Sequence, residues 1–281
     1  YNIVIKVFLV KDEFIMKKFP IYVLSVAAII IVFFFYSLCI LKYSIKVEET
    51  IINSLNIPSS FDGVRLIQFS DLHLKNEEDL VLLEKSVNEI NRLEADIIVF
   101  TGDLFEKGAV TSSLSSQTIE ILSQLKSSLA KLAILGDKDL SQPDEISHIL
   151  TTSSFKILRN ESLELYNGSS EGINFIGIDS LSSSPDLNTL LSQSTNTNNF
   201  NILLLHEPTL AAKVTDYPIE VQLSGHCRGQ SSTSGCSQFY SGTYRFADQL
   251  TLQVNRGLNR PNNIGNLLTR PTLYSFLLIK E

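Results

Sequence analysis

Five short stretches of the chain place an aspartate or a histidine directly after an apolar run. The stretches read FSDLHLK, FTGDLFE, ILGDKDL, LLLHEP and LSGHCRGQ. The side chains that they present are Asp71, His73, Asp103, Asp137, His206 and His226. Because carboxylate oxygens and imidazole nitrogens are ligands for divalent cations, these stretches predict a metal site.

The position of these donors favours one shared site. Asp71 and His73 are two residues apart, so both point to the same side of an extended segment. Taken singly, an aspartate after a strand is more simply a turn or a helix cap, and a lone histidine is more often a surface residue. Five stretches in the same context favour a site instead, because open α/β sheets build their sites at the carboxyl ends of their strands.

The elements that must position these donors alternate between strands and helices. We expect a strand over 64–70, a helix over 77–93, a strand from 96, a helix over 117–129, a strand over 132–135 and a helix over 144–151. Shorter apolar runs follow, so the second half should be richer in strands. This order is typical of a layered α/β domain.

An uncharged apolar run near the N-terminus predicts a membrane span. Residues 19–41 carry no charge and lie between Lys18 and Lys42. A run of this length crosses the ~30 Å hydrocarbon layer as a helix, whereas a buried core helix is usually shorter. No small-residue cleavage site follows it. We therefore expect an uncleaved signal anchor over 19–41, a linker over 42–60 and a domain over 61–281.

The charges around this span indicate its orientation. Lys17 and Lys18 precede it, so the positive-inside rule puts residues 1–18 in the cytoplasm and the domain on the outer side of the cell membrane. Lys42 and Lys46 follow the span and act against this orientation. The chain's single methionine, at position 16, opens a basic and then apolar stretch. Residues 1–15 are therefore expected to be upstream sequence that the native protein lacks.

Composition limits the possible partners. The 281 residues include 44% hydrophobic ones, enough for a full core. There are 23 basic residues against 30 acidic ones, and the formal net charge of −7 argues against nucleic acid as a partner. Cys227 and Cys236 form a disulfide if the domain is exported, or remain two free thiols. The sequence leaves both states open.

The order of the motifs resembles that of the calcineurin-like metallophosphoesterase superfamily, whose pattern is D-x-H, G-D, G-N-H-[DE], H and G-H-x-H. The likeness runs from about residue 64 to the end, including VNRGLN, and is strongest to a membrane-anchored bacterial branch of envelope and lipid-precursor phosphodiesterases. It implies a four-layer αββα sandwich of two mixed β-sheets. It also implies one or two divalent ions, Mn, Fe, Zn or Mg, and hydrolysis by metal-activated water.

The resemblance also implies a role for each donor. Asp71 and His73 would bind the first metal, and Asp103 would bridge both metals. The second metal would be bound by Asp137, His206 and His226.

Three positions depart from the family pattern. Asp137 replaces an asparagine and still supplies an oxygen. Lys138 replaces a histidine, and we assign it the catalytic role of bringing positive charge to a phosphoryl group. Arg228 replaces the last histidine, and a guanidinium cannot ligate a metal. We expect Arg228 to lie beside Asp71 or Asp137 in place of the first metal's charge, or to grip the substrate phosphate.

The resemblance, together with the membrane span, implies a phosphoesterase that acts on a phosphodiester or a pyrophosphate of a lipid-linked or other cell-envelope substrate. The alternative is a weak or inactive relative that binds a metal and a phosphorylated ligand at the membrane, because selection on catalysis has lapsed. A purely structural membrane protein is a third interpretation, and the retained aspartates and histidines oppose it.

Overall fold

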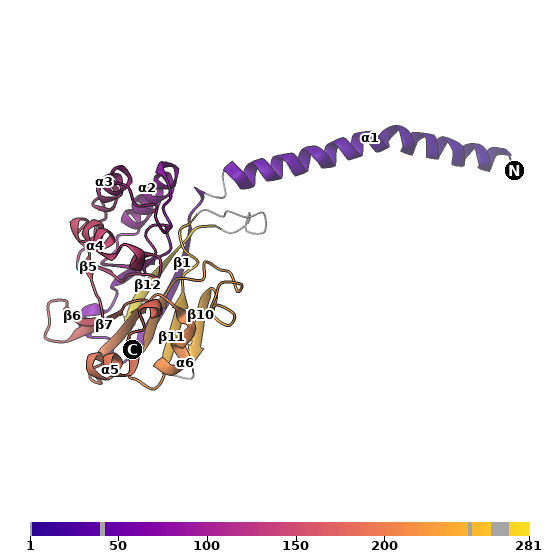
Figure 1. Cartoon of the computed structure of the whole chain (residues 1–281). Coiled ribbons are helices and arrows are strands. Elements are labelled where there is room, and N and C mark those ends of the chain that lie inside the picture. Colours follow the sequence, from indigo (N-terminus) through magenta and orange to yellow (C-terminus); the bar gives the residue numbers. More distant parts are fainter. Residues whose placement is uncertain (1, 40–42, 247–248, 260–269) are drawn as a thin grey trace. The chain divides into compact units, whose positions relative to one another are not determined.

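The computed structural model describes residues 2–39, 43–246, 249–259 and 270–281 (Figure 1). The chain divides into two units, each of which is described by itself. One unit contains the N-terminal helix, and the other, residues 45–260 and 271–281, contains both sheets.

Two six-stranded mixed sheets form the centre of the second unit. The first sheet has the order β1 (Lys46–Ser54), β12 (Thr272–Lys280), β2 (Arg65–Phe69), β3 (Ile97–Phe100), β4 (Ala130–Ala133) and β5 (Lys156–Ile157). The second has the order β10 (Gly242–Phe246), β11 (Leu250–Val254), β9 (Val221–Ser224), β8 (Phe200–Leu205), β7 (Gly172–Ile178) and β6 (Glu161–Tyr166). Strands β2, β3 and β4 are parallel neighbours, and so are β8 and β9. Their carboxyl ends therefore share an edge within each sheet.

Helices cover the outer face of each sheet. The first sheet packs against α2 (Glu77–Arg92), α3 (Ser112–Leu122) and α4 (Pro143–Thr152), and the second against α5 (Leu187–Ser194) and α6 (Ala211–Val214). Short 3-10 turns are η2 (Ser59–Phe61), η3 (Asp139–Ser141), η4 (Leu181–Ser183) and η5 (Pro208–Leu210). The expected four-layer α/β sandwich is confirmed.

The strands are apolar on both faces because each contributes to two cores. In β2, Leu66 lies in the core between the sheets, and its neighbour Ile67 lies in the core under the helices. In β8, Leu204 and Leu203 divide in the same way between the inner core and the outer core of the second sheet. Successive strand residues point to opposite faces, so a strand buried on both sides reads as a continuous apolar run.

Two expected boundaries were wrong. The helix expected over 117–129 is α3, which begins five residues earlier because Thr111 accepts a hydrogen bond from the Leu114 N–H and so caps it. The segment expected as a linker over 42–60 contains β1, which pairs in parallel with β12. The sequence did not predict β1 because it is an edge strand with charged residues and little buried apolar surface. Even Ile51 is 59% exposed.

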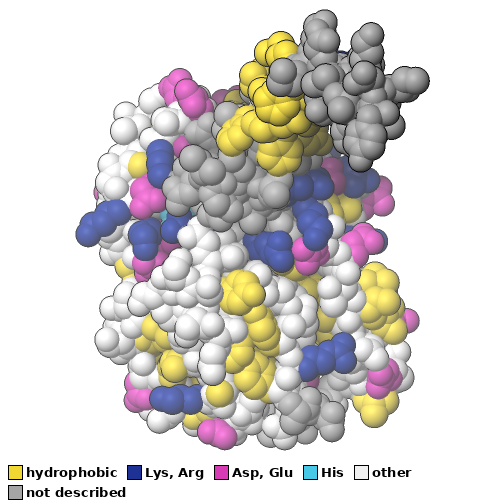
Figure 2. All heavy atoms as spheres, turned by 90° about the vertical axis from the view of Figure 1, so that its right-hand side faces the viewer, with side chains coloured by type: hydrophobic (Ala, Val, Ile, Leu, Met, Phe, Trp, Pro, Cys, Tyr) yellow, Lys and Arg dark blue, Asp and Glu magenta, His cyan; other side chains and the backbone are white. Residues whose placement is uncertain are grey.

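The first unit contains α1 (Asn2–Cys39), a helix that runs through both the expected cytoplasmic segment and most of the expected span. Its window Lys18–Tyr36 has a mean hydropathy of 2.5, and among the described residues α1 is the one helix long and apolar enough to cross a membrane. The side chains of this window are exposed, and Figure 2 shows its hydrophobic groups open to view. The last two residues of the expected span lie outside the described residues.

Candidate metal centre

Five loops bring the predicted donors together at the carboxyl ends of β2, β3, β4, β8 and β9. Within the first sheet, the Asp71 N–H donates to the carbonyl of Gly102 at 2.9 Å, and the His73 N–H donates to that of Asp103 at 3.1 Å. Across the sandwich, the His226 N–H donates to Asp71 Oδ2 at 3.0 Å. All six predicted metal ligands therefore lie in one cluster, although they are up to 155 residues apart in the chain.

One group of donors is almost completely buried. His73 Nε2 lies 3.5 Å from Asp71 Oδ1 and 3.4 Å from Asp103 Oδ2. His206 Nε2 lies 3.4 Å from the same Asp103 oxygen. None of these side chains is more than 3% exposed. The Oδ2 atom of Asp103 thus lies between the imidazoles of His73 and His206.

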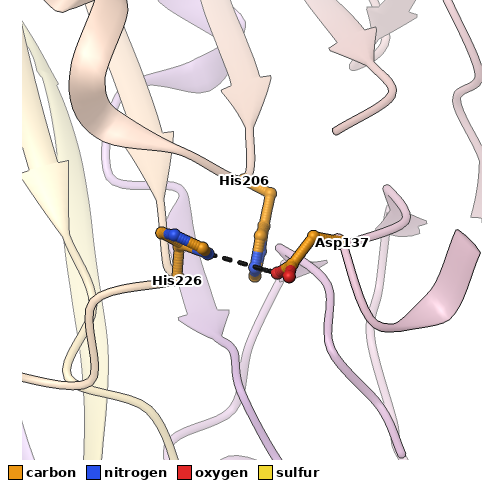
Figure 3. A group of neighbouring side chains, drawn as sticks. All are labelled: Asp137, His206 and His226. Atoms are coloured by element: carbon orange, nitrogen blue, oxygen red, sulfur yellow. Dashed lines mark hydrogen bonds and ion pairs between the residues drawn. The ribbon is translucent and has the colours of Figure 1, made fainter. Parts of the chain in front are cut away.

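The second group lies beside it and opens partly to solvent. Asp137 Oδ1 is 3.4 Å from His206 Nε2 and 3.2 Å from His226 Nδ1 (Figure 3). Figure 3 shows the two imidazoles converging on this carboxylate from the loops after β8 and β9. Two nitrogens and an oxygen at these separations can surround a single cation.

Backbone carbonyls orient the two imidazoles in opposite ways. His206 Nδ1 lies 2.6 Å from the carbonyl of Thr101, so its proton is placed there and Nε2 faces the carboxylates. His226 Nε2 lies 3.2 Å from the carbonyl of Ser234, which leaves Nδ1 facing Asp137. Each ring therefore turns its other nitrogen to the same space, where a cation can take the place of a proton.

Three buried atoms at the centre of the cluster have no hydrogen-bond partner among the described residues. They are Asp71 Oδ1, His73 Nε2 and His206 Nε2. An unpartnered buried polar atom costs about 1–3 kcal/mol, so three in one place need an explanation. A divalent cation supplies it, because all three atoms are of metal-ligating types. The residues present therefore fit the metals that the motifs imply.

The charges of the cluster also favour a cation. Burial opposes the charged form of His206, yet the carboxylates of Asp103 and Asp137 outweigh it and raise its pKa well above the usual value. Burial likewise opposes the charged form of His226, and its hydrogen bond to Asp137 still raises its pKa. Burial favours protonated Asp71, but the nearby imidazole of His73 and the charge of His206 hold its pKa below the usual value. Negative charge is in excess here.

Several site residues have strained backbones. Asp71, His73, Asp103 and His226 have φ of 53°, 46°, 63° and 68°, in the left-handed region. Such conformations cost about 1–3 kcal/mol each and persist where the surrounding structure imposes them. The sharp turns that they make aim each donor from its strand end into the cluster. Gly225 allows one close approach, since a Cβ there would overlap Asp71 Oδ2.

Lys138 and Arg228, two of the three departures from the family pattern, differ in their contacts. The Lys138 ammonium forms an ion pair with Asp137 Oδ2. Burial lowers the pKa of Lys138, but the hydrogen bond to Asp137 outweighs it and raises the pKa. For Arg228 the described part of the chain holds no ion pair with Asp71 or Asp137. Asp137 is instead paired with Lys138, and Asp71 accepts from the His226 N–H, so the expectation that Arg228 binds the substrate phosphate stays a prediction.

Two residues without an assigned role support the cluster. Asp139 is buried and accepts from the N–H groups of Asp103, Leu104 and Gly136 at 2.7, 2.9 and 2.9 Å. Burial and the charge of Asp103 raise its pKa to about 7. Glu106 Oε2 lies 3.3 Å from His73 Nδ1. Both are present in the motif stretches ILGDKDL and FTGDLFE, so their proximity to the donors in sequence was the available signal.

Known proteins resemble this chain in sequence. The family model described as calcineurin-like phosphoesterase matches residues 64–228. The Bacillus subtilis metallophosphoesterase YkuE is 32% identical over 84% of this chain and 86% of its own length. The Chlamydia trachomatis UDP-2,3-diacylglucosamine pyrophosphatase LpxG is 24% identical over 77% of each chain. A Danio rerio transmembrane protein with a metallophosphoesterase domain is 29% identical over 75% of this chain and 52% of its own.

Among solved structures, TT1561 of Thermus thermophilus is similar with a TM-score of 0.47 and 14% identity, over 69% of this chain and 90% of that one. The matched family model covers more than half of the chain, and YkuE exceeds 30% identity over most of both proteins. This chain therefore belongs to the calcineurin-like phosphoesterase family.

Proposed function

We propose that this protein is a membrane-anchored, metal-dependent phosphoesterase that hydrolyses a phosphodiester or a pyrophosphate in a lipid-linked or other cell-envelope substrate. The observation that carries this proposal is the set of unpartnered buried donors at the centre of the cluster. Metal-ligating atoms without partners, within an excess of carboxylates, are suited to Mn, Fe, Zn or Mg.

Each donor has a place in this proposal. Asp71 and His73 hold one ion, Asp103 is shared, and the other ion is held by Asp137, His206 and His226. Such ions, when bound, polarise the phosphoryl oxygen and activate water. The carbonyls of Thr101 and Ser234, behind His206 and His226, orient the opposite ring nitrogens towards the ion.

Two positively charged side chains, those of Lys138 and Arg228, are assigned to binding the substrate. Lys138 lies against Asp137 at the partly open side of the cluster, where its charge can stabilise the phosphoryl oxygens. The guanidinium of Arg228 has no ion pair among the described residues, so it is free to bind a phosphate oxygen pair of the substrate. Arg228 thus acts on the substrate, beside the ligands.

The membrane part of the proposal rests on α1. Its apolar window is long enough to cross a bilayer, and Lys17 and Lys18 favour a cytoplasmic N-terminus. Cys227 and Cys236 are joined in a disulfide, which is typical of domains outside the cytoplasm. The relative named as a UDP-2,3-diacylglucosamine pyrophosphatase supports a pyrophosphate attached to a lipid-like group.

A second candidate is a weakly active or inactive protein that binds a metal and a phosphorylated ligand. It is favoured by Lys138, which takes up one oxygen of Asp137, and by Arg228, which stands where the family has a ligating histidine. Under this candidate the phosphate is held and not hydrolysed.

One preparation tests both candidates. The full chain is purified in detergent, its metals are measured by elemental analysis, and hydrolysis of bis(p-nitrophenyl) phosphate and of a nucleotide-linked lipid pyrophosphate is followed. We expect bound metal and hydrolysis, both lost in His206→Ala and retained in His148→Ala, which changes an exposed histidine of α4. Bound metal with no hydrolysis supports the second candidate, and a chain that binds no metal contradicts both.

The orientation has its own test. A protease added to intact cells should remove the domain from the cell surface, since the proposal places residues 61–281 outside. A domain that is cut only after the cells are opened contradicts this orientation, whatever the activity.

A further inference from the structure

A disulfide closes the loop that follows the last metal-ligating histidine. Cys227 is the residue after His226, and its sulfur is bonded to that of Cys236, nine residues later. Both cysteines are completely buried and belong to the core on the outer face of the second sheet. The loop therefore follows a proposed metal ligand, His226, and both of its ends are anchored in the core by buried cysteines.

Between the two cysteines the loop has little packing of its own. Every residue from 228 to 235 is exposed or only half-buried. Its internal hydrogen bonds are short-range, such as the Gln230 N–H to the Cys227 carbonyl at 2.8 Å and the Cys236 N–H to the Thr233 carbonyl at 3.0 Å. A segment with so few contacts samples many conformations unless its ends are held. Here the disulfide holds them.

This loop carries the carbonyl that orients His226. Ser234, two residues before Cys236, places its carbonyl oxygen 3.2 Å from His226 Nε2. The opposite ring nitrogen, Nδ1, lies 3.2 Å from Asp137 Oδ1. The position of one loop carbonyl thus decides which nitrogen of His226 is turned to the metal-ligating side.

We propose that the Cys227–Cys236 disulfide is a positioning element of the metal centre: it fixes the Ser234 carbonyl, which holds the Nε2 proton of His226 and directs the Nδ1 lone pair at the cation beside Asp137. This inference rests on the proposed function, since it requires that His226 ligate a metal. It adds a role for two residues that neither ligate a metal nor contact substrate.

His206 provides a natural contrast within the same group. Its proton is held on Nδ1 by the Thr101 carbonyl, at the end of β3, and not by the disulfide-closed loop. His206 should therefore ligate through Nε2 and His226 through Nδ1. Loosening the loop should affect His226 and leave His206 unchanged.

The first measurement is zinc affinity, by competition with a chelating dye, on the full chain in detergent. In the double variant Cys227→Ala with Cys236→Ala we expect affinity to fall by about 10-fold or more, the usual effect of removing support behind a ligating histidine. Cys39→Ala, which removes the third cysteine from α1, and Ser232→Ala, in the same loop, are matched controls that should bind zinc as the unaltered chain does.

A second variant moves the loop without breaking the disulfide. Gly235 has φ of 80°, and a Cβ there would lie 2.8 Å from Thr209 Cγ2. Gly235→Ala should therefore displace Ser234 and weaken zinc binding in the same direction. This variant keeps the proposal testable if the double alanine variant does not fold.

The second measurement distinguishes positioning from general loss of structure. With ¹⁵N-labelled histidine and bound zinc, NMR should show Nδ1 ligation for His226 and Nε2 ligation for His206 in the unaltered chain. In Cys227→Ala with Cys236→Ala and in Gly235→Ala, the His226 signals should change to a mixture of ligation states, and those of His206 should remain.

The outcomes separate the two proposals. An unaltered chain that binds no zinc through His206 and His226 contradicts the proposed function and this inference with it. Full zinc binding and unchanged His226 signals in the folded variants overturn this inference alone. Equal changes at His206 and His226 also overturn it, because they indicate general disorder of the site.

Discussion

The two halves of the metal cluster are built differently. Asp71, His73 and Asp103 come from the ends of two neighbouring parallel strands, β2 and β3, and are almost completely buried. Asp137, His206 and His226 come from both sheets, and Asp137 and His226 are partly exposed. The first half is fixed by a sheet edge. The second half depends on how two sheets and a disulfide-closed loop meet.

This difference has a consequence for metal binding. The first half has one imidazole of its own, and Arg228 stands where the family has another ligating histidine. The second half has two imidazoles, a carboxylate and access to Asp103, enough donors for a stable complex. We therefore expect one cation to bind tightly in the second half, although the first half is more deeply buried.

The largest effect should come from the residue that the halves share. Asp103→Asn keeps the size of the side chain but removes the charge that faces both His73 Nε2 and His206 Nε2. Removing a residue that only hydrogen-bonds to a metal ligand lowers metal affinity or activity by about 10–100-fold. Removing the charge of a shared ligand should therefore lower kcat/KM for bis(p-nitrophenyl) phosphate by more than ~100-fold. Asp186→Asn, an exposed cap of α5, is the control. Retained metal and rate in Asp103→Asn would show that the halves are independent.

A smaller effect should distinguish the halves from each other. His226→Ala should weaken the tight cation by about 10–100-fold, whereas His73→Ala should leave that cation bound. Titration of the metal-free chain with zinc, followed by calorimetry, measures both. If His73→Ala removes the tight cation and His226→Ala does not, the order of affinity that we assign is reversed.

Changing Lys138 and Arg228 to the histidines of the family pattern should strengthen metal binding in the first half of the cluster. A unit charge ~10 Å from a dication, at an effective dielectric of ~40, costs about 1.7 kcal/mol, which is more than tenfold in affinity. Arg228→His with Lys138→His removes two such charges, so the affinity for a second ion should rise by roughly 100-fold, and the rate should rise with it. Arg228→Gln removes the charge without adding a ligand and should give a smaller gain. If the unaltered chain already binds two metal ions tightly, the charge of Arg228 does not weaken binding of the second ion.

The smallest effect on metal should come from the residue that ties the halves together. Asp139 accepts three N–H groups from the loops after β3 and β4. In Asp139→Asn one carboxylate oxygen becomes an NH₂ group, which cannot accept a hydrogen bond from these backbone N–H groups. The free energy of unfolding should therefore fall by roughly 1–3 kcal/mol. Urea unfolding measures the change, with Asp144→Asn in the first turn of α4 as control. Unchanged stability would mean that these hydrogen bonds are replaced by others.

Local patterns were sufficient for much of the fold. The apolar run before Asp71 and the helical periodicity over 77–93 predicted the bounds of β2 and α2 within a residue or two. A strand buried on both faces and an amphipathic helix each have a recognisable pattern of apolar residues in the sequence. The strand β1 was missed, since an edge strand with charged residues lacks both signals. The start of α3 was missed because its cap lies in a serine-rich stretch that also suits a loop.

The same division applies to the site. The types and order of the six donors, their place after strands and the substitutions at Lys138 and Arg228 were all determined by the sequence, because each is a property of a short stretch. Only the tertiary structure decided that Lys138 and not Arg228 pairs with Asp137, that Cys227 is bonded to Cys236, and which nitrogen of each histidine faces the carboxylates. The contact of His206 with the Thr101 carbonyl joins segments 105 residues apart, which meet only when the two sheets pack together. The other contacts join residues within nine positions of each other, but several bent conformations are open to such short loops, and only the folded structure selects one.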